Sequence, residues 1–332
     1  MRAVIVKAPG EIHVGEVAEP TPAEGQVIVQ VAACGICGTD IHIVDGDLPP
    51  TPYPIIPGHE FGGEIVAIGP EVDGAAVGDR VAVQPNMPCG RCRPCRIGRS
   101  SICETWRAIG VTLPGAAAEL VAVPANECYT LPDTISDRAA ALVEPLSCAV
   151  HGMARLPRGA VDRFLVYGAG TMGLLIAQLA RQAGSPSVSV VDVNPGRLEL
   201  ASRLGASAVA VSGAELPDSD GFDVVVDATG VVSAIEDGLT RVRRGGTFLQ
   251  FGVSSPGATA RFSPYRIYNE EINIIGSMAV HNSFLPAVEL IASGAVNVDA
   301  LVSDALPLAA YEEAIATFRS GRGRKIHILP GS

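Results

Sequence analysis

No hydrophobic run in the sequence approaches the roughly 18 residues that a membrane-spanning helix needs. The N-terminus also lacks the apolar core and cleavage site of a secretory signal, because residues 1–7 begin directly in strand-like alternation. Positive charge is scarce as well, since charged residues make up 18% of the chain and give a net charge of -11. These absences argue against a membrane or nucleic acid as a general partner. We therefore expect a soluble, cytoplasmic protein that acts on a small molecule.

The length of 332 residues predicts two domains, from a prior of about 100–200 residues for each. Residues 1 to about 130 contain short alternating runs, such as 27–31 and 64–68, cut by glycine and proline, and indicate a β-barrel-like unit. Strand-like runs then alternate with helical stretches, at residues 163–167, 187–191, 208–211, 223–227, 247–251 and 272–276. This alternation predicts an α/β fold with a doubly wound parallel sheet.

The segment 34–60 carries a first candidate metal site. Cys37, His59 and Glu60 offer thiolate, imidazole and carboxylate donors, which is the ligand set of an open catalytic zinc. Taken alone, Cys37 and His59 are also compatible with a buried thiol and a surface imidazole. The rest of the chain has to decide between these two interpretations.

Three polar residues beside Cys37 could support such a site. Asp40 is close enough in sequence to accept a hydrogen bond from the second ring nitrogen of His59 and to fix its tautomer. Thr39 and His42 could form a path that carries a proton away from the metal.

A second candidate metal site is a cluster of four of the eight cysteines within fifteen residues. The spacing C-x2-C-x2-C-x7-C lets short loops bring four thiolates into a tetrahedron around a structural zinc: Cys89, Cys92, Cys95 and Cys103. The arginines between them would offset the negative charge of a zinc tetrathiolate: Arg91, Arg93, Arg96 and Arg99. The alternatives are local disulfides, an iron–sulfur cluster or a nucleic-acid zinc module.

Glu144 follows an apolar stretch at residues 139–143 and precedes Pro145. A carboxylate in such surroundings is costly to bury without a cation. The residues alone favour the simpler interpretation, an acid on the surface of a helix.

Residues 168–173 have the pattern G-x-G-x-x-G, with a buried-strand run before them and a helical stretch after them. That context matches a loop in which glycines allow a tight turn and the helix N-terminus faces a pyrophosphate. Asp192 ends the next strand, nineteen residues past Gly173, where an acid accepts hydrogen bonds from an adenosine ribose. Its charge would repel a 2′-phosphate, which predicts NAD rather than NADP. The alternative is an aspartate that caps the helix starting near Pro195.

Several motifs, spread over essentially the whole chain, occur together: Gly35-Ile36-Cys37-Gly38-Thr39-Asp40, Gly58-His59-Glu60, Gly78-Asp79-Arg80-Val81, the four-cysteine loop, Glu144-Pro145-Leu146, the glycines of residues 168–173 and Asp192. In this combination the sequence resembles the zinc-containing medium-chain alcohol and polyol dehydrogenases. The Glu-Pro-Leu form at residue 144 is similar to the polyol branch, such as sorbitol dehydrogenase, because alcohol dehydrogenases proper usually have cysteine there. One departure is Met278-Ala279, at the approximate position where sorbitol dehydrogenases carry a polyol-binding arginine.

The resemblance implies a GroES-like catalytic domain at residues 1–145 and 281–332 and a Rossmann NAD-binding domain at residues 146–280. It implies that Cys37, His59 and Glu144 bind the catalytic zinc, with Glu60 as a fourth ligand or as one that exchanges with water. The residues expected to bind NAD are Gly168, Gly170, Thr171, Met172 and Gly173 at the pyrophosphate, Asp192 and Arg197 at the adenosine, and Thr229, Gly230, Val253 and Met278 at the nicotinamide half.

The resulting hypothesis is a homo-oligomeric enzyme, a dimer or tetramer, that holds two zinc ions per chain and oxidises a secondary alcohol of a polyol or diol to a ketone with NAD. Threonine dehydrogenase and simple secondary-alcohol dehydrogenase are alternatives. Threonine dehydrogenases usually have aspartate at the position of Glu144, which counts against the first of them. A non-catalytic nucleotide-binding protein is an alternative from another class.

Overall fold

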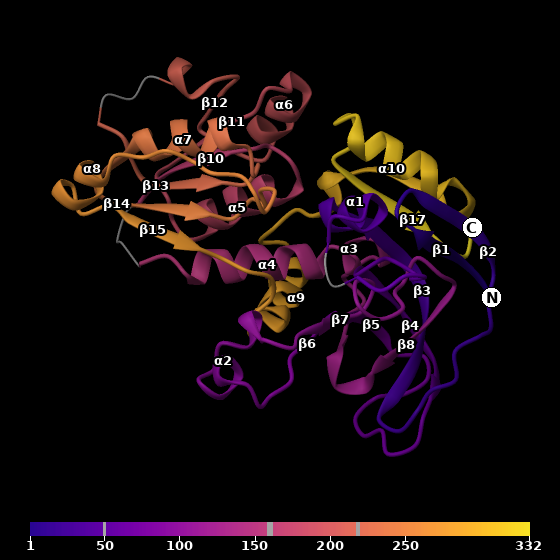
Figure 1. Ribbon diagram of the computed structural model, residues 1–332. Helices are drawn as coiled ribbons and strands as arrows, with labels where there is room; N and C mark the ends of the chain where they lie inside the picture. The colour runs from indigo at the N-terminus through magenta and orange to yellow at the C-terminus, as the bar shows by residue number, and fades with distance from the viewer. Residues whose placement is uncertain (49–50, 158–161, 217–219) are drawn as a thin grey trace. The chain divides into compact units, whose positions relative to one another are not determined.

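The computed structural model describes residues 1–48, 51–157, 162–216 and 220–332 (Figure 1). The chain divides into two compact units. The first contains residues 1–147, 280–294 and 298–332, and the second contains residues 148–279 and 295–297. Within the described ranges, no helix combines the length and the apolar character that crossing a bilayer requires.

The first unit is built around β3 (Gln26–Ile36), an eleven-residue strand with eight buried residues. It pairs antiparallel with β4 (Glu60–Ile68), β8 (Leu120–Pro124) and β17 (Lys325–Leu329). The rest of this sheet, in the order β16-β17-β3-β4-β5-β9, consists of β16 (Val302–Pro307), β5 (Arg80–Val83) and β9 (Cys128–Thr130). Two small sheets complete the unit: β1 (Arg2–Ala8) with β2 (Glu11–Glu16), and β6 (Asn86–Met87) with β7 (Arg107–Ala108).

Helices of the first unit are short. They are α1 (Gly38–Asp45), α2 (Arg93–Arg96), α3 (Asp137–Ala140), α9 (Phe284–Ala292) and α10 (Tyr311–Arg319), while α4 (Val143–Ala154) begins in this unit and continues into the second. Single 3-10 turns occur at Ser100–Ile102, Ala125–Glu127, Asp299–Leu301 and Leu308–Ala310.

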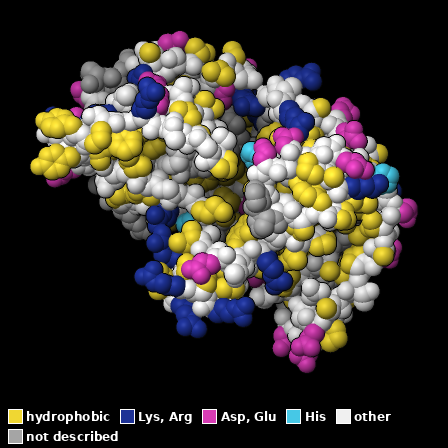
Figure 2. All heavy atoms as spheres, viewed as in Figure 1, with side chains coloured by type: hydrophobic (Ala, Val, Ile, Leu, Met, Phe, Trp, Pro, Cys, Tyr) yellow, Lys and Arg dark blue, Asp and Glu magenta, His cyan; other side chains and the backbone are white. Residues whose placement is uncertain are grey.

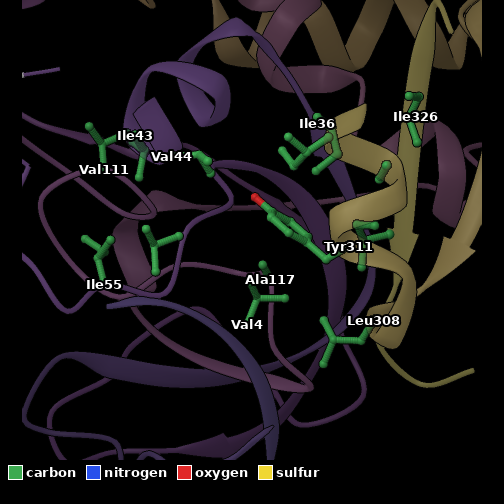
Figure 3. Packing of buried hydrophobic residues seen from close by; sticks show 14 of the residues in the cluster. Val4, Ile36, Ile43, Val44, Ile55, Val111, Ala117, Leu308, Tyr311 and Ile326 are labelled. Carbon is green, nitrogen blue, oxygen red and sulfur yellow. The ribbon is translucent and has the colours of Figure 1, made fainter. Parts of the chain in front are cut away.

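A hydrophobic cluster joins the C-terminal segment to the strands of the first unit (Figure 3). Tyr311 and Leu308 are fully buried in it and pack with Val4, Ile36 and Ile326. Burial of a large apolar side chain contributes about 1.5–3 kcal/mol. Because Ile36 ends β3 and precedes Cys37, the cluster fixes the backbone that carries the first candidate metal ligand.

The second unit contains a six-stranded parallel sheet in the order β12-β11-β10-β13-β14-β15. Its strands are β10 (Arg163–Tyr167), β11 (Ser187–Val191), β12 (Ala208–Ala210), β13 (Phe222–Asp227), β14 (Val242–Gln250) and β15 (Asn273–Gly276). Its other elements are α5 (Thr171–Gln182), α6 (Pro195–Arg203), α7 (Val232–Arg241), α8 (Pro264–Asn269) and a 3-10 turn at Gly213–Glu215. This is the strand order 3-2-1-4-5-6 of dinucleotide-binding folds, and it confirms the predicted doubly wound sheet.

The strand order reverses between β10 and β13, which are neighbours in the sheet. Ligands of open α/β sheets bind beyond the carboxyl ends of the strands at such a switch point. The loops that follow β10 and β13 are residues 168–170 and 228–231, so the sheet places the glycine-rich loop at this position.

Candidate active site

Cys37 lies at the junction between β3 and α1, where it is the N-cap residue of the helix. Its Sγ accepts a hydrogen bond from the backbone N–H of Thr39 at 3.3 Å, and its own N–H donates to Asp40 Oδ2 at 2.9 Å. These hydrogen bonds hold the sulfur at the N-terminal end of α1.

His59 directly precedes β4 and is only 7% exposed, so the surface-imidazole interpretation is wrong. Its Nε2 lies 3.1 Å from Cys37 Sγ, and its Nδ1 lies 3.7 Å from Asp40 Oδ1. The ligand atoms of Cys37, Asp40 and His59 all lie within 4.8 Å of one another. Two segments separated in the sequence thus bring a sulfur and a nitrogen donor together.

The electrostatics of this group suit a cation. Burial lowers the pKa of His59, but the negative charges of Cys37 and Asp40 outweigh it and raise that pKa well above its usual value. Burial raises the pKa of the fully buried Asp40. Among the described residues, Asp40 Oδ1 and His59 Nδ1 have no hydrogen-bond partner. A site that attracts a proton to an imidazole also attracts a metal ion, which displaces that proton, and the sulfur and nitrogen donors fit zinc.

Glu144 is the second residue of α4 and is 8% exposed, so the interpretation as a surface acid is wrong. Its negative charge raises the pKa of both His59 and Lys325, which places the carboxylate near them. Among the described residues, the group within 4.8 Å contains neither Glu144 nor Glu60. The sequence-based roles of both glutamates as zinc ligands stay predictions.

Lys325, on β17, is a buried charge that the sequence analysis missed. Its Nζ forms an ion pair with Glu60 Oε2, and each side chain is 3% exposed. Burial lowers the pKa of Lys325, but the negative charges of Glu60 and Cys37 raise it by a larger amount. The net shift of the pKa is therefore upward. In the sequence, Lys325 stands out only by its residue type, because it is one of two lysines in a chain with 24 lysines and arginines.

Thr39 and His42 both lie on α1 and are partly exposed. His42 Nδ1 lies 3.5 Å from Asp47 Oδ2. In the described part of the chain no hydrogen bond joins the Thr39 hydroxyl to the His42 ring. The proton path through these residues therefore stays a prediction.

The four-cysteine lobe, residues 89–103, brings all four sulfur atoms within 4.8 Å of one another. The N–H of Cys92 donates to Cys89 Sγ and the N–H of Cys89 donates to Cys103 Sγ, both at 3.3 Å. Hydrogen bonds from Thr105 and from the backbone lower the pKa of Cys89 to about 5. None of the eight cysteines, all of which lie in the described part of the chain, forms a disulfide, so the alternative of local disulfides is wrong. The lobe fits a tetrahedral metal with no open position.

The arginines of the lobe are exposed. Figure 2 shows dark blue side chains gathered over the place that α2 occupies in Figure 1. The exposed arginines of the lobe are Arg91, Arg93, Arg96 and Arg99. Their positive charge stands beside thiolates that would carry net negative charge with zinc bound.

The glycine-rich loop has the geometry that a pyrophosphate site requires. Gly168 adopts φ +97°, and Gly170 is the N-cap of α5, which begins at Thr171. A Cβ at Gly173 would collide with the carbonyl oxygen of Gly168, so only glycine lets the helix approach the strand this closely. Met172 is the second residue of α5 and is half-buried. The N-terminus of α5 therefore follows directly on this turn, as a pyrophosphate site at a helix N-terminus requires.

Asp192 follows β11 and is 9% exposed. Its Oδ2 accepts a hydrogen bond from Ala169 N and its Oδ1 from Asn194 N, both at 2.7 Å. Arg197 Nη1 lies 3.9 Å from Asp192 Oδ2. The cap of α6 is Asn194, whose side chain accepts from Gly196 N at 3.0 Å, so the capping interpretation of Asp192 is wrong.

Asp227, at the end of β13, is a second buried acid whose role the sequence analysis missed. Its carboxylate accepts hydrogen bonds from the N–H groups of Thr229 at 3.0 Å and Gly230 at 2.9 Å, and from Gln250 Nε2 at 2.8 Å. Gly230, at φ +71°, leaves no room for a Cβ against the carbonyl of Val253. Asp227 therefore holds together the loops that carry three of the four predicted nicotinamide contacts. The fourth, Met278, is 50% exposed.

Models of two protein families match the chain. The alcohol dehydrogenase GroES-like domain matches residues 23–133, and the zinc-binding dehydrogenase model matches residues 171–293. These matches cover the core of each unit and confirm the predicted pairing of a GroES-like domain with a Rossmann domain.

Curated relatives are similar over nearly the full length. The chain is 36% identical to D-arabinitol dehydrogenase 1 of Uromyces fabae over 342 residues, which covers 99% of this chain and 97% of that protein. It is 36% identical to D-altritol 5-dehydrogenase of Agrobacterium fabrum, over 92% of this chain and 90% of that protein. It is 33% identical to an L-threonine 3-dehydrogenase of Aeromonas hydrophila, over 95% of each.

Among solved structures, a zinc-binding dehydrogenase chain of Sinorhizobium meliloti bound to NADP superposes with a TM-score of 0.95 and 32% identity, covering 99% of each chain. Fold, relatives and the two clusters of metal-binding side chains agree. The chain belongs to the zinc-containing medium-chain alcohol and polyol dehydrogenase family of enzymes.

Proposed function

We propose that this enzyme oxidises a secondary alcohol of a polyol to a ketone with NAD, using a zinc held by Cys37, His59 and Glu144. The observation that carries the proposal is the 3.1 Å approach of Cys37 Sγ to His59 Nε2 beside buried Asp40. A metal at this point would replace the proton that the group otherwise draws onto His59. The relatives that act on D-arabinitol and D-altritol support a polyol as the substrate class.

Zinc held by Cys37, His59 and Glu144 would supply a Lewis acid that lowers the pKa of the alcohol hydroxyl, and bound nicotinamide would supply the hydride acceptor. The protein's own residues orient the metal ligands and move the proton. Asp40 Oδ1 lies 3.7 Å from His59 Nδ1, so Asp40 would fix the tautomer of His59 that leaves Nε2 to a metal. Thr39 and His42 stand next along α1 and are the candidates for passing the hydroxyl proton to solvent.

The second zinc belongs in the four-cysteine lobe, where it would hold residues 89–103 in place. All four positions of a tetrahedral metal are taken by sulfur there, so no substrate can bind to it. We assign this metal a structural role.

Asp192 supports NAD over NADP. Its buried carboxylate directly follows β11 and accepts a hydrogen bond from Ala169 N in the glycine-rich loop, so a 2′-phosphate at this position would meet a fixed negative charge. The S. meliloti structure with NADP makes this a point for direct measurement. We expect NAD to give the higher kcat/KM, and Asp192→Ser to reduce that preference by roughly tenfold or more, about 1.4 kcal/mol. Equal use of both cofactors by the unmodified enzyme would contradict the assignment.

A substrate panel tests the proposal as a whole. D-arabinitol, D-altritol, 2,3-butanediol, 2-propanol and L-threonine, each with NAD, are compared by the absorbance of the reduced cofactor. We expect the highest kcat/KM with a polyol. About one zinc per chain, held in the four-cysteine lobe alone, together with no turnover of any alcohol, would favour the non-catalytic nucleotide-binding alternative.

Threonine oxidation is the second candidate, because relatives named L-threonine 3-dehydrogenase match 95% of the chain. Glu144 counts against it, since threonine dehydrogenases usually have aspartate at this position. The highest kcat/KM with L-threonine would replace the polyol proposal by this one.

We further propose that the enzyme is a cytoplasmic homo-oligomer, a dimer or a tetramer. The family resemblance supports the assembly and the composition supports the compartment. Light scattering of the purified enzyme at micromolar concentration would measure the mass, and a monomer would contradict the proposal.

A further inference from the structure

Tyr311, the first residue of α10, carries a hydroxyl into the hydrophobic cluster of the first unit. The residue is fully buried, and among the described residues it is the only buried member of this cluster with a polar side-chain atom. Its Oη has no hydrogen-bond partner in the described part of the chain. A phenylalanine would pack with the same ring and would bury no hydroxyl, whereas an unpaired buried hydroxyl is unfavourable. The hydroxyl at this position therefore needs a physical explanation.

The hydroxyl of Tyr311 points toward the helix that carries Asp40. Figure 3 shows the ring extending from α10 with its oxygen directed toward Val44 on α1. Asp40 lies four residues before Val44, so the two buried side chains share one face of α1. An ion pair between Arg319 and Asp45 also joins the end of α10 to the end of α1. The two helices are thus held together with the hydroxyl on the side of α1 that presents Asp40.

The charge of Asp40 acts on this hydroxyl. Burial raises the pKa of Tyr311 well above its usual value, and the negative charge of Asp40 raises it further. The thiols of Cys34 and Cys37 contribute less than Asp40 does. Of the ionisable groups around Tyr311, the Asp40 carboxylate is therefore the one that its hydroxyl can best serve as a donor.

Asp40 has one oxygen that is bound and one that is not. Its Oδ2 accepts the hydrogen bond from the N–H of Cys37 at 2.9 Å. Its Oδ1 lies 3.7 Å from His59 Nδ1, and neither of these atoms has a hydrogen-bond partner among the residues that the structure describes. With Tyr311 Oη, three unpaired polar atoms of buried side chains occur around α1. Buried waters typically make about three hydrogen bonds to polar atoms of this kind.

We propose that Tyr311 is a positioning residue for the catalytic metal site, whose hydroxyl holds the Asp40 carboxylate in place behind His59 through one ordered water. The inference rests on the proposed function, because it presupposes a metal bound by His59. It deepens that function by adding a residue of the C-terminal segment to the groups that orient a metal ligand.

The hydrogen bonds of such a water balance. Tyr311 donates its hydroxyl proton to the water, and the water donates one of its own to Asp40 Oδ1. The second lone pair of the water can accept from the Nδ1–H of His59, which is the tautomer that leaves Nε2 to a metal. Asp40 is then held at both oxygens, by the N–H of Cys37 and by the water. A carboxylate fixed at both oxygens keeps its position behind the imidazole.

The test uses the full-length enzyme with zinc in the four-cysteine lobe and Co(II) at the catalytic site. The variants are Tyr311→Phe, Asp40→Asn and the double change. Tyr53→Phe is the matched control, because the hydroxyl of Tyr53 donates to the backbone carbonyl of Ile43 on the same helix at 2.5 Å. The readouts are the visible spectrum of Co(II), the rate at which a chelator removes it, and the Tm. A high-resolution crystal structure of the unmodified, metal-loaded enzyme is the direct test of the water.

We expect Tyr311→Phe to change the Co(II) spectrum and to speed metal removal by about fivefold, the size expected for the loss of one hydrogen bond. In the Asp40→Asn background the same change should alter the removal rate by less than about twofold, because the hydroxyl acts through the carboxylate. Tyr53→Phe should lower the Tm and leave the spectrum and the removal rate unchanged. The crystal structure should show one water within hydrogen-bond distance of both Tyr311 Oη and Asp40 Oδ1.

Three results would overturn the proposal: a Tyr311→Phe enzyme with a changed Tm but an unchanged spectrum and removal rate, an equal effect of Tyr311→Phe with and without Asp40→Asn, or a crystal structure in which no water joins the two atoms. If Tyr311→Phe does not fold, the crystal structure of the unmodified enzyme decides the question. Failure of the proposed function is recognised separately, as an unmodified enzyme that binds no metal dependent on Cys37.

Discussion

The two candidate metal sites of the first unit are built in opposite ways. The four-cysteine lobe draws all its ligands from fifteen consecutive residues, and most of the side chains between them are exposed. The site at Cys37 combines β3, α1, β4, α4 and β17, and nearly every group around it is buried. Local spacing defines the first site, whereas long-range packing defines the second.

The difference has an electrostatic side. In the lobe, the sulfur atoms of Cys89 and Cys103 accept hydrogen bonds from backbone N–H groups, and the arginines between the cysteines are exposed to solvent. In the site at Cys37, buried polar side chains face each other in pairs: Asp40 faces His59, and Glu60 forms an ion pair with Lys325. Buried pairs are sensitive to the loss of either partner, so we expect single changes there to alter chemistry and single changes in the lobe to alter stability.

The largest effect should follow Cys37→Ser. A hydroxyl cannot replace the thiolate as a soft ligand, so turnover should fall below detection and the zinc content should fall from about two to about one per chain. Metal analysis and the rate of NADH formation measure both. Cys128→Ser is the control, because Cys128 is a free thiol on β9 outside both metal groups. Unchanged turnover in Cys37→Ser would refute the active-site assignment.

Cys95→Ser tests the other side of the comparison. It should also remove about one zinc, but the main result should be lower stability: a loss of about 3 kcal/mol, or roughly 6–12 °C in Tm. Binding of NADH, followed by its fluorescence, should persist because the glycine-rich loop belongs to the second unit. A Tm equal to that of the unmodified enzyme would mean that the lobe needs no metal.

The same contrast explains how much could be predicted from the sequence. The four-cysteine lobe and the glycine-rich loop could be predicted, because their residues lie close together in the sequence and their geometry follows from the spacing. The roles of Lys325 and Asp227 could not be predicted in this way, because strand pairing brings each of them close to a partner that is distant in the sequence. The burial of His59 and Glu144 was equally hidden, because an isolated polar residue looks the same in a sequence whether it is buried or exposed.

Asp40→Asn tests the second layer of the buried site. An amide keeps the size of the side chain and removes the negative charge that faces His59, so zinc affinity should fall by roughly 10–100-fold. Competition with a chelator measures this affinity, with Asp47→Asn as a control because Asp47 is exposed and pairs with His42 instead. Equal affinities in the two variants would show that Asp40 does not orient the ligand.

The smallest effect concerns pH and His327, which lies on β17 two residues from Lys325. His327 is fully buried, and neither of its ring nitrogens has a hydrogen-bond partner among the described residues. Burial, with the positive charges of Lys325 and Arg138, lowers the pKa of His327 to about 3. The unfolded chain, with a histidine pKa near 6.5, therefore binds the proton first as the pH falls.

His327 thus leaves stability intact above about pH 6.5 and reduces it by up to about 1.4 kcal/mol per pH unit between there and pH 3. Replacement by leucine should remove this slope, so that the variant gains relative stability on going from pH 7.5 to pH 5. Urea unfolding at both pH values, with excess zinc, measures the difference, and His13→Leu is the control because His13 is exposed. If the wild-type enzyme and His327→Leu lose stability equally, the imidazole is not held neutral.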